Sequence, residues 1–443
     1  MKVLKFGGTS VGSVENLKRI KAILQKDKDQ KVVICSAMSG VTDTLVKLTQ
    51  YARLKDEKGV NEITNQLETK HVAVIDELID SSSLKAEMKD YLSSNITAIF
   101  DLCHKQFSES VEAQIVTYGE TLLTYIFSKY LEETGLSNTL LAAKDFMYVE
   151  NTDNPNIELV AQKFNKVLQN NEPQLIITQG FVCRNHLGAI STLKRGGSDY
   201  TATIIGAALQ ATEIQIWTDI DGLHNNDPRF VEHTQPIAHL TYEEAAELAY
   251  FGAKILHPQT VSPVVDKDIP VLLKNTFDPD ATGTVISNRI HQNGLKAISA
   301  KDHITAIKIK SNRMLMAHGY LRQIFEVFDR YATSIDMITT SEIAISLTID
   351  NTEFLDKIVA EIEAYAEITI ESEYSIICIV GESVINDQKS YKLFEILNHI
   401  SVRMISYGGS DNNISLLVPT KDKIETLRYL NKQLFQTSET LSI

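Results

Sequence analysis

The stretch Lys5–Ser10, KFGGTS, tells more about the fold and function of this chain than any other six residues. A short apolar run precedes it, and Leu17, Ile20 and Leu24 follow at helical spacing, so the order is strand, glycine turn, helix. Glycines let backbone N–H groups approach an anion, while the helix start and the lysine add positive charge. The stretch therefore predicts a phosphate-binding turn, although an ordinary strand-to-helix turn could contain the same glycines. It is not the common P-loop, whose lysine follows its glycines.

The size and charge of the chain narrow the class of protein. Its 443 residues suggest two or three domains, and 43% hydrophobic with 23% charged residues is ordinary for a globular protein. A net charge of −14 argues against a nucleic-acid or anionic-membrane partner, because both attract basic surfaces. The first residues contain no apolar signal region, and no apolar run approaches the length of a membrane span. We therefore expect a cytoplasmic protein.

The cysteines show no CxxC pair and no spacing typical of a metal site, so no metal-ligand set is expected from the protein. Reduced, half-buried thiols are the simplest interpretation for a cytoplasmic chain. The four cysteines are Cys35, Cys103, Cys183 and Cys378.

Up to about residue 290, short apolar segments alternate with segments of helical period. Residues 31–35, 174–178 and 214–217 are typical of buried strands, and residues 42–135 form a long, polar, helical section. This alternation predicts a parallel or mixed sheet covered by helices on both faces. Ligands of such sheets bind at the carboxyl ends of the strands, where the glycine-rich turns fall.

Beyond about residue 300 a different pattern occurs twice. The segments that begin at Phe325, Met337 and Ile345 return at Phe394, Met404 and Ile414, with offsets of 69, 67 and 69 residues. A repeat with the order strand, helix, strand, strand, helix, strand predicts two ferredoxin-like modules. Two unrelated amphipathic segments could also produce this likeness by chance.

Three further clusters carry polar residues suited to a ligand. Residues 194–202 (KRGGSDYTA) place an arginine against a glycine turn, and its planar fork suits a carboxylate or phosphate. Residues 217–223 (WTDIDGL) and the DPR at 227–229 follow a strand and could hold a ribose or a solvated Mg²⁺. A helix from Thr241 leads to FGAKILHP at 251–258, whose lysine could approach phosphates. Plain turns and a surface lysine would explain the last two clusters equally well.

Taken in order along the chain, these motifs resemble those of monofunctional aspartate kinases, which have the α/β amino-acid kinase fold followed by two ACT modules. The resemblance rests on KFGGTS, SAMSGVT, TYGE, ITQGF, RGGSDYTA, TDIDG, DPR and FGAKILHP, and it covers essentially the whole chain. It implies a catalytic domain over 1–295 and α+β ACT modules over 296–372 and 373–443. It also implies transfer of the ATP γ-phosphoryl group, with Mg²⁺, to the β-carboxylate of L-aspartate, the first step of lysine, threonine and methionine biosynthesis.

The resemblance also implies roles for individual residues. Because the attacking carboxylate is already an anion, no general base is expected, and catalysis rests on positioning and charge compensation. Lys5 would meet the transferring phosphoryl group, and Asp199 would orient Lys5 and the substrate amine. The residues implied for aspartate are Thr42, Glu120, Phe181, Arg195 and Ser198. Those implied for ATP are Lys5, Gly7, Gly8, Thr218, Asp219, His224, Arg229 and Lys254, and His224 stands where the family often has tyrosine.

An effector site in the first ACT module is implied as well. The residues that match the pattern of lysine-inhibited relatives are Met314, Gly319, Asp336, Thr340, Ser341 and Glu342. Met316 and Ala317 depart from this pattern, which usually has a polar pair including a serine at these positions. Alanine cannot donate the hydroxyl hydrogen bond of that serine, which would contribute about 1 kcal/mol. Lysine is the expected feedback effector, with threonine or weak regulation left open. ACT modules of this kind pair across two-fold axes, so a homodimer or homotetramer is expected.

Two other functions stay open at this point. Another carboxylate kinase of the same fold would act on glutamate or acetylglutamate, but RGGSDYTA and the ACT pair are typical of the aspartate enzymes. An amino-acid sensor with an inert kinase half would not need Lys5, Glu120, Arg195 and Asp199, all of which are present.

Overall fold

The computed structural model describes residues 1–152, 154–169, 171–193, 196–252, 258–290, 294–311, 319–386 and 393–436. The chain forms two compact units, of which the first comprises residues 1–223, 238–242 and 256–288 and the second comprises 224–237, 243–255 and 289–443. The second unit thus contains two segments, 224–237 and 243–255, that fall inside the predicted catalytic domain. No helix among the described residues is long and apolar enough to cross a membrane.

An eight-stranded sheet organises the first unit, with the strand order β3-β4-β2-β1-β7-β9-β10-β8. Neighbouring strands are parallel except for β9 and β10, which are antiparallel, so the predicted mostly parallel sheet is confirmed. Every residue of β2 and β4 is buried, because helices cover both faces. The strands are β1 (Lys2–Phe6), β2 (Lys31–Cys35), β3 (Thr139–Leu141), β4 (Leu175–Gln179), β7 (Glu213–Thr218), β8 (His239–Thr241), β9 (Val271–Asn275) and β10 (Thr284–Ser287).

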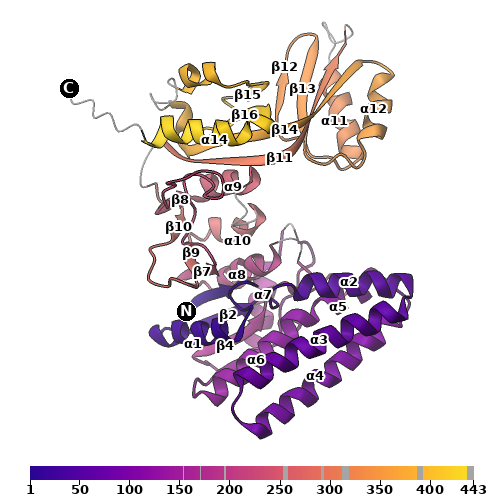
Figure 1. Cartoon of the computed structure of the whole chain (residues 1–443), viewed down its shortest axis with the longest axis vertical. Coiled ribbons are helices and arrows are strands. Elements are labelled where there is room, and N and C mark those ends of the chain that lie inside the picture. The colour runs from indigo at the N-terminus through magenta and orange to yellow at the C-terminus, as the bar shows by residue number, and fades with distance from the viewer. Residues whose placement is uncertain are drawn as a thin grey trace, which may run out of the picture. The chain divides into compact units, whose positions relative to one another are not determined.

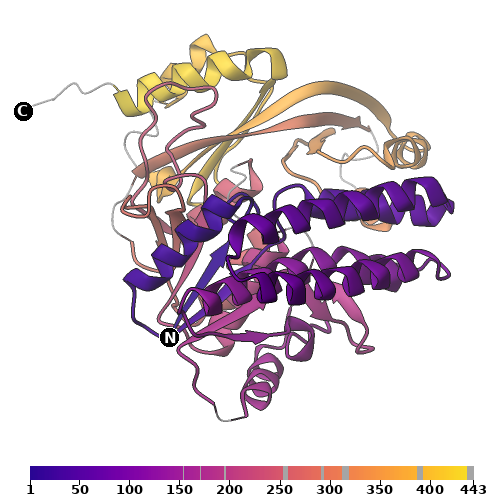
Figure 2. The same cartoon turned by 60° about the horizontal axis from the view of Figure 1, so that its bottom comes forward.

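The long polar section of the first unit is helical, as the sequence predicts, and its helices α2, α3 and α4 lie side by side (Figures 1 and 2). The Asp56 carboxylate caps α3 by accepting a hydrogen bond from Gly59 N at 3.1 Å. The helices are α1 (Val14–Lys26), α2 (Val41–Leu54), α3 (Glu57–Leu78), α4 (Ser82–Cys103), α5 (Glu109–Val116), α6 (Tyr118–Glu133), α7 (Ile157–Leu168), α8 (Gly197–Ala208) and α10 (Ser262–Val265), and a small hairpin joins β5 (Val182–Arg184) to β6 (Ile190–Thr192).

The second unit is built on a six-stranded antiparallel sheet with the order β12-β13-β11-β14-β16-β15. Its two central strands, β11 (Gly294–Lys310) and β14 (Glu367–Glu382), are unusually long and pair along most of their length, as Figure 1 shows. The elements are α9 (Tyr242–Tyr250), β11 (Gly294–Lys310), α11 (Tyr320–Arg330), β12 (Ile338–Thr340), β13 (Ala344–Ile349), α12 (Leu355–Glu363), β14 (Glu367–Glu382), β15 (Met404–Ser406), β16 (Asn413–Pro419) and α14 (Lys423–Asn431).

The two repeated segments share this sheet but have separate hydrophobic cores. Ile307 and Ile309, in the second half of β11, pack with side chains of α11, β13 and α12. Ile298, in the first half of the same strand, packs instead with side chains of β14, β16 and α14. The first strand of the first module therefore also completes the core of the second one, which a repeat read along the sequence does not reveal. The module boundaries 296–372 and 373–443 remain predictions.

The four cysteines are all free and buried in the structure, rather than half-buried. Burial raises the pKa of Cys35 to about 12, and the neighbouring Lys5 lowers it only in part. The thiol therefore stays protonated and takes no part as a nucleophile at neutral pH.

Candidate functional site

Lys5 lies near the carboxyl end of β1, and its ammonium group pairs with the first turn of α8. Lys5 Nζ is 2.5 Å from Asp199 Oδ1, and the two side chains are only 11% and 14% exposed. The contact has the distance of an ion pair. Gly196 at φ 74° lets the chain turn directly into α8 and brings Asp199 to this position. Strand, turn and helix start thus deliver a cation and its counter-ion to one place.

The glycine turn lies directly beside this ammonium group. A Cβ atom at Gly7 would stand 3.3 Å from Lys5 Nζ, and one at Gly8 would stand 3.3 Å from Ala37 O. Gly7 N donates to Trp217 O at 3.2 Å, which ties the turn to the end of β7. The turn continues for several residues before α1 begins at Val14, and the side chain of Ser13 caps α1 by accepting a hydrogen bond from Asn16 N. The predicted order of strand, turn and helix is confirmed, and the turn brings backbone close to the lysine.

Glu120 in the first turn of α6 supplies a buried carboxylate. Its Oε1 accepts a hydrogen bond from Ala37 N at 3.2 Å, while Oε2 is buried without a hydrogen-bond partner among the described residues. Burial raises the pKa of Glu120 to about 7, and its backbone hydrogen bonds lower it only in part. A Cβ at Gly119 would come within 2.8 Å of the Ala37 side chain, so glycine is needed for this close approach. A buried carboxylate with one free oxygen is suited to a ligand cation.

The exit of β4 packs against the start of α8. Phe181 has φ 67°, a strained value for a side chain of this size, and its N–H is held by the Thr201 hydroxyl at 2.9 Å. A Cβ at Gly180 would lie 2.5 Å from the Ser198 hydroxyl, which places that hydroxyl at the end of β4. Phe181 and Ser198 therefore lie at the start of α8, which carries Asp199, while Thr42 lies partly exposed in the first turn of α2.

The residues predicted for the nucleotide are divided between the two units. Thr218 and Asp219 end β7 in the first unit, where the Thr218 hydroxyl donates to Asp219 Oδ1 at 3.0 Å. His224 and Arg229 belong to the second unit, and Arg229 is bound to the carboxylate of Asp227 through contacts of 2.5 to 3.1 Å. Two predicted residues, Arg195 and Lys254, lie outside the described residues, as does Met314 of the effector set.

Asp336, one of the predicted effector residues, has a buried carboxylate in the second unit. Asp336 Oδ1 accepts hydrogen bonds from Lys301 Nζ at 2.7 Å and from the Tyr250 hydroxyl at 2.9 Å. Lys301 Nζ also lies 2.9 Å from Asp350 Oδ2 and 4.3 Å from the centre of the Tyr250 ring. Asp336 Oδ2 is buried with no hydrogen-bond partner among the described residues, and burial raises the pKa of this carboxyl group.

The other described effector residues occupy turns at the ends of α11 and β12. Gly319 begins α11 at φ 84°, and Thr340 ends β12. Ser341 N donates to Ala344 O at 2.8 Å within the tight turn that also contains the exposed Glu342. Sequence reasoning missed both Lys301 and Tyr250. The position of Lys301 on a half-buried strand could have indicated that residue, but no sequence signal indicated Tyr250.

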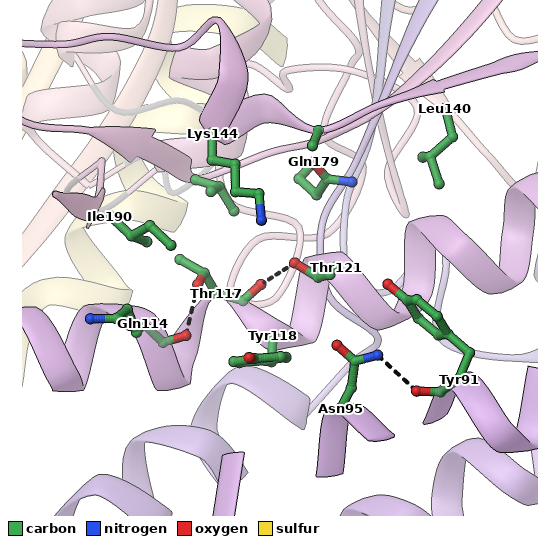
Figure 3. Close-up of a pocket in the computed structure, with 12 residues that line it drawn as sticks. Tyr91, Asn95, Gln114, Thr117, Tyr118, Thr121, Leu140, Lys144, Gln179 and Ile190 are labelled. Carbon is green, nitrogen blue, oxygen red and sulfur yellow. Dashed lines mark hydrogen bonds between the residues drawn. The ribbon is translucent and has the colours of Figure 1, made fainter. Parts of the chain in front are cut away.

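A separate cavity of about 310 Å³ lies in the first unit. Figure 3 shows the Lys144 side chain extending into it towards Tyr118. None of the site residues predicted from the sequence that the structure describes lines this cavity. The lining residues are Tyr91, Asn95, Gln114, Thr117, Tyr118, Thr121, Leu140, Ala142, Lys144, Gln179, Val182 and Ile190. Among the described residues, no group of three or more histidine, cysteine, aspartate and glutamate side chains could hold a metal ion.

Comparisons with known proteins agree with this arrangement. Residues 1–275 match the amino acid kinase family, and residues 377–434 match an ACT domain. The chain is 33% identical over 458 residues to "Aspartokinase 3, chloroplastic" of Arabidopsis thaliana, with 98% of this chain and 82% of that protein covered. It is 31% identical over 449 residues to "Lysine-sensitive aspartokinase 3" of Escherichia coli strain K12, with 98% and 99% covered. The structure of E. coli aspartokinase III in complex with aspartate and ADP, in its R-state, matches with a TM-score of 0.84 and 30% identity, covering 98% of this chain and all of that one.

Proposed function

The chain belongs to the amino acid kinase family as an aspartokinase with a C-terminal ACT region, and on that premise we propose which of its residues carry the reaction. An aspartate kinase is a phosphotransferase whose acceptor is a carboxyl group. The phosphoryl donor is proposed to be ATP, since the E. coli relative was solved with ADP and aspartate. The acceptor is the β-carboxylate of L-aspartate, and the product is an acyl phosphate.

The difficulty of this reaction is to bring two anions together. Two unit negative charges about 4 Å apart repel by about 4 kcal/mol at an effective dielectric constant near 20. Lys5 lies beside the glycine turn, where its ammonium group would offset that repulsion on the phosphoryl group in transfer. Asp199 pairs with this ammonium group and would hold it in place. No general base is needed, because the acceptor is ionised at neutral pH.

The amino acid is proposed to bind beside this pair. Glu120 would receive its ammonium group on the unpartnered Oε2, and Arg195 would hold a carboxylate in bidentate fashion. Phe181, Ser198 and Thr42 would line the remaining walls. The strained backbone of Phe181 supports this role, since strain of this kind collects at ligand sites.

The nucleotide is proposed to contact the glycine turn and the residues after β7. The full set is Lys5, Gly7, Gly8, Thr218, Asp219, His224, Arg229 and Lys254. Mg²⁺ is bound largely by nucleotide phosphates and needs few protein carboxylates, so Asp219, exposed after a strand, would suffice to hold it through water. The bound Mg²⁺ would neutralise negative charge on the phosphates.

Regulation is proposed to act through the effector residues of the second unit. The E. coli relative is named lysine-sensitive, and Asp336 Oδ2 offers a buried acceptor for an ammonium group. Lysine is therefore the proposed effector. We also propose the domain division 1–295, 296–372 and 373–443, assembly into a homodimer or homotetramer through the ACT modules, and a cytoplasmic location.

The observation that carries the catalytic proposal is the Lys5–Asp199 pair beside the glycine turn. A hydroxamate assay, which traps acyl phosphates, tests it with aspartate and glutamate as alternative acceptors. Lys5→Met should lower kcat by about 10²-fold or more, because a group that stabilises charge in the transition state is lost. Lys18→Met, which removes an exposed lysine of α1, is the matched control and should retain full turnover. Near-normal turnover of Lys5→Met would refute the role of the lysine, and product from glutamate alone would refute the assigned acceptor.

A further inference from the structure

The loop that carries His224 and Arg229 packs on the last helix of the ACT region. Residues 224–237, called here the DPR loop, fall inside the predicted catalytic domain, but they belong to the second unit. Ile298 N in β11 donates to Asn225 O at 2.8 Å, and Val231 is buried in the same hydrophobic core as Leu427 of α14. The DPR loop is therefore part of the packed interior of the second module.

Asn226 makes the central polar contact between the DPR loop and α14. Its side chain is 2% exposed, and Nδ2 lies 3.3 Å from Leu427 O and 3.4 Å from Asn431 Oδ1. Its Oδ1 accepts a hydrogen bond from Asp227 N at 2.9 Å. Because a buried amide must satisfy its donors and acceptor, one side chain fixes both the helix and the residue that binds Arg229.

Two cations of α14 hold the next part of the loop. Arg428 Nε donates to Phe230 O at 2.9 Å, and Lys423 Nζ lies 4.7 Å from the centre of the Phe230 ring. Lys423 is itself anchored by Asp302 at 2.7 Å. The backbone directly after Arg229 is thus bound from the helix side.

The DPR loop is also tied to itself, so it can move only as one piece. Asn225 and Gln235 exchange hydrogen bonds of 2.9 and 2.8 Å across its two arms. His224 Nδ1 lies 2.8 Å from the Thr234 hydroxyl, and Asp227 binds the guanidinium group of Arg229. A displacement of α14 would therefore carry His224 and Arg229 with it.

We propose that Asn226 and Arg428 are positioning residues for the phosphoryl donor: they fix the DPR loop on α14 so that His224 and Arg229 are preorganised for the nucleotide. This inference rests on the proposed role of those two residues in ATP binding. It gives the second ACT module a function of its own, because the helix that completes its core also sets the place of a nucleotide-binding loop. The residues proposed for aspartate include none from this loop.

Kinetic constants of variants on α14 test the proposal in the full-length enzyme. Arg428→Ala removes one hydrogen bond from a charged donor and should raise the KM for ATP by about fivefold to tenfold. The KM for aspartate and the kcat at saturating ATP should stay within twofold of wild type. Arg428→Lys, which can still donate to Phe230 O, should recover part of the loss. Glu425→Ala, an exposed change on the same helix, is the matched control and should leave all three constants unchanged.

Two further variants separate the possible outcomes. Asn431→Leu should act like Arg428→Ala, and if it does not fold, the exposed Arg428 still carries the test. Should Arg229→Ala raise the KM for ATP while both α14 variants leave it unchanged, the positioning role is wrong and the nucleotide role of Arg229 stands. Should Arg229→Ala also have no effect, the DPR loop has no part in nucleotide binding, and both proposals fail. An equal rise in both KM values would show a merely structural role and would also overturn the inference.

Discussion

Glu120 offers the sharpest prediction, because its ionisation falls within the working range of an enzyme assay. Its carboxyl group is buried, and burial raises its pKa from 4.5 to about 7. The proposed partner is the ammonium group of aspartate, which only the ionised form would bind well. The affinity for aspartate should therefore follow the ionised fraction of this one residue.

The magnitude follows from a simple titration. With a pKa of about 7, roughly one tenth of the unliganded enzyme carries ionised Glu120 at pH 6, and roughly nine tenths does at pH 8. The KM for aspartate should therefore fall about tenfold between these pH values, at saturating ATP. The acceptor carboxylate is ionised throughout this range, so the change reports on the enzyme rather than on the nucleophile.

The same carboxyl group should make the stability of the unliganded enzyme depend on pH. Between pH 4.5 and about 7 the folded state retains a proton that the unfolded state has lost, so stability falls as the pH rises through this range. The full effect would be about 3 kcal/mol. Aspartate should restore that stability at pH 8, since its ammonium group compensates the buried charge.

Initial rates at constant ionic strength from pH 6 to 8.5, with thermal melts in parallel, measure both effects. Glu120→Gln keeps the shape of the side chain and is the control. It should bind aspartate weakly at every pH, with no tenfold change, and should melt at a higher temperature than the wild type at pH 8 without ligand. A KM for aspartate that is constant from pH 6 to 8, or one that changes equally in Glu120→Gln, would refute the reasoning.

Two other predictions concern buried charge elsewhere. Lys301→Met removes the cation from Asp336 Oδ1, so an effector ammonium group should bind more tightly. We expect half-maximal inhibition at a several-fold lower lysine concentration than in the control variant Lys308→Met on the same strand. An unchanged or higher concentration for half-maximal inhibition would contradict this prediction. His71 in α3 is fully buried, and burial lowers its pKa, so stability should be retained above pH 6.5 and lost as the pH falls below it. In melts at pH 7.5 and 5.5, His71→Leu should lose less stability on acidification than the wild type, by up to about 1.4 kcal/mol per pH unit. An equal loss of stability in both proteins would count against this account.

The sequence predicts well those features that are set by local pattern. Residues 32–35 are all apolar and lie between Lys31 and Ser36, and they predict the buried strand of a covered sheet that β2 forms. Gly7 and Gly8 between a strand and a helix predict a turn that a ligand can approach, and the turn lies where the sequence puts it. The pairing of Lys5 with Asp199, which the family resemblance implied, is also present.

The features that the sequence does not predict depend on tertiary contacts with no local signal. Nothing in residues 294–301 indicates that they complete the second module, because half-buried strands of either module have the same alternation. The two polar partners of Asp336 come from segments 35 and 86 residues away. The assignment of the DPR loop to the second unit has the same origin, since the loop has the composition of any turn.

The division of the nucleotide residues between the units changes what the glycine turn can do by itself. Of the residues proposed for the nucleotide, the first unit contributes Lys5, the glycine turn and the end of β7, which are proposed to compensate charge on the phosphoryl group. Arg229, an additional cation proposed for the donor, is held by Asp227, whose N–H donates to Asn226, and Asn226 in turn contacts α14. If both roles hold, losing the contacts between the DPR loop and α14 should weaken binding of the donor. A displacement of α14 within the second unit would then itself lower the affinity for the donor.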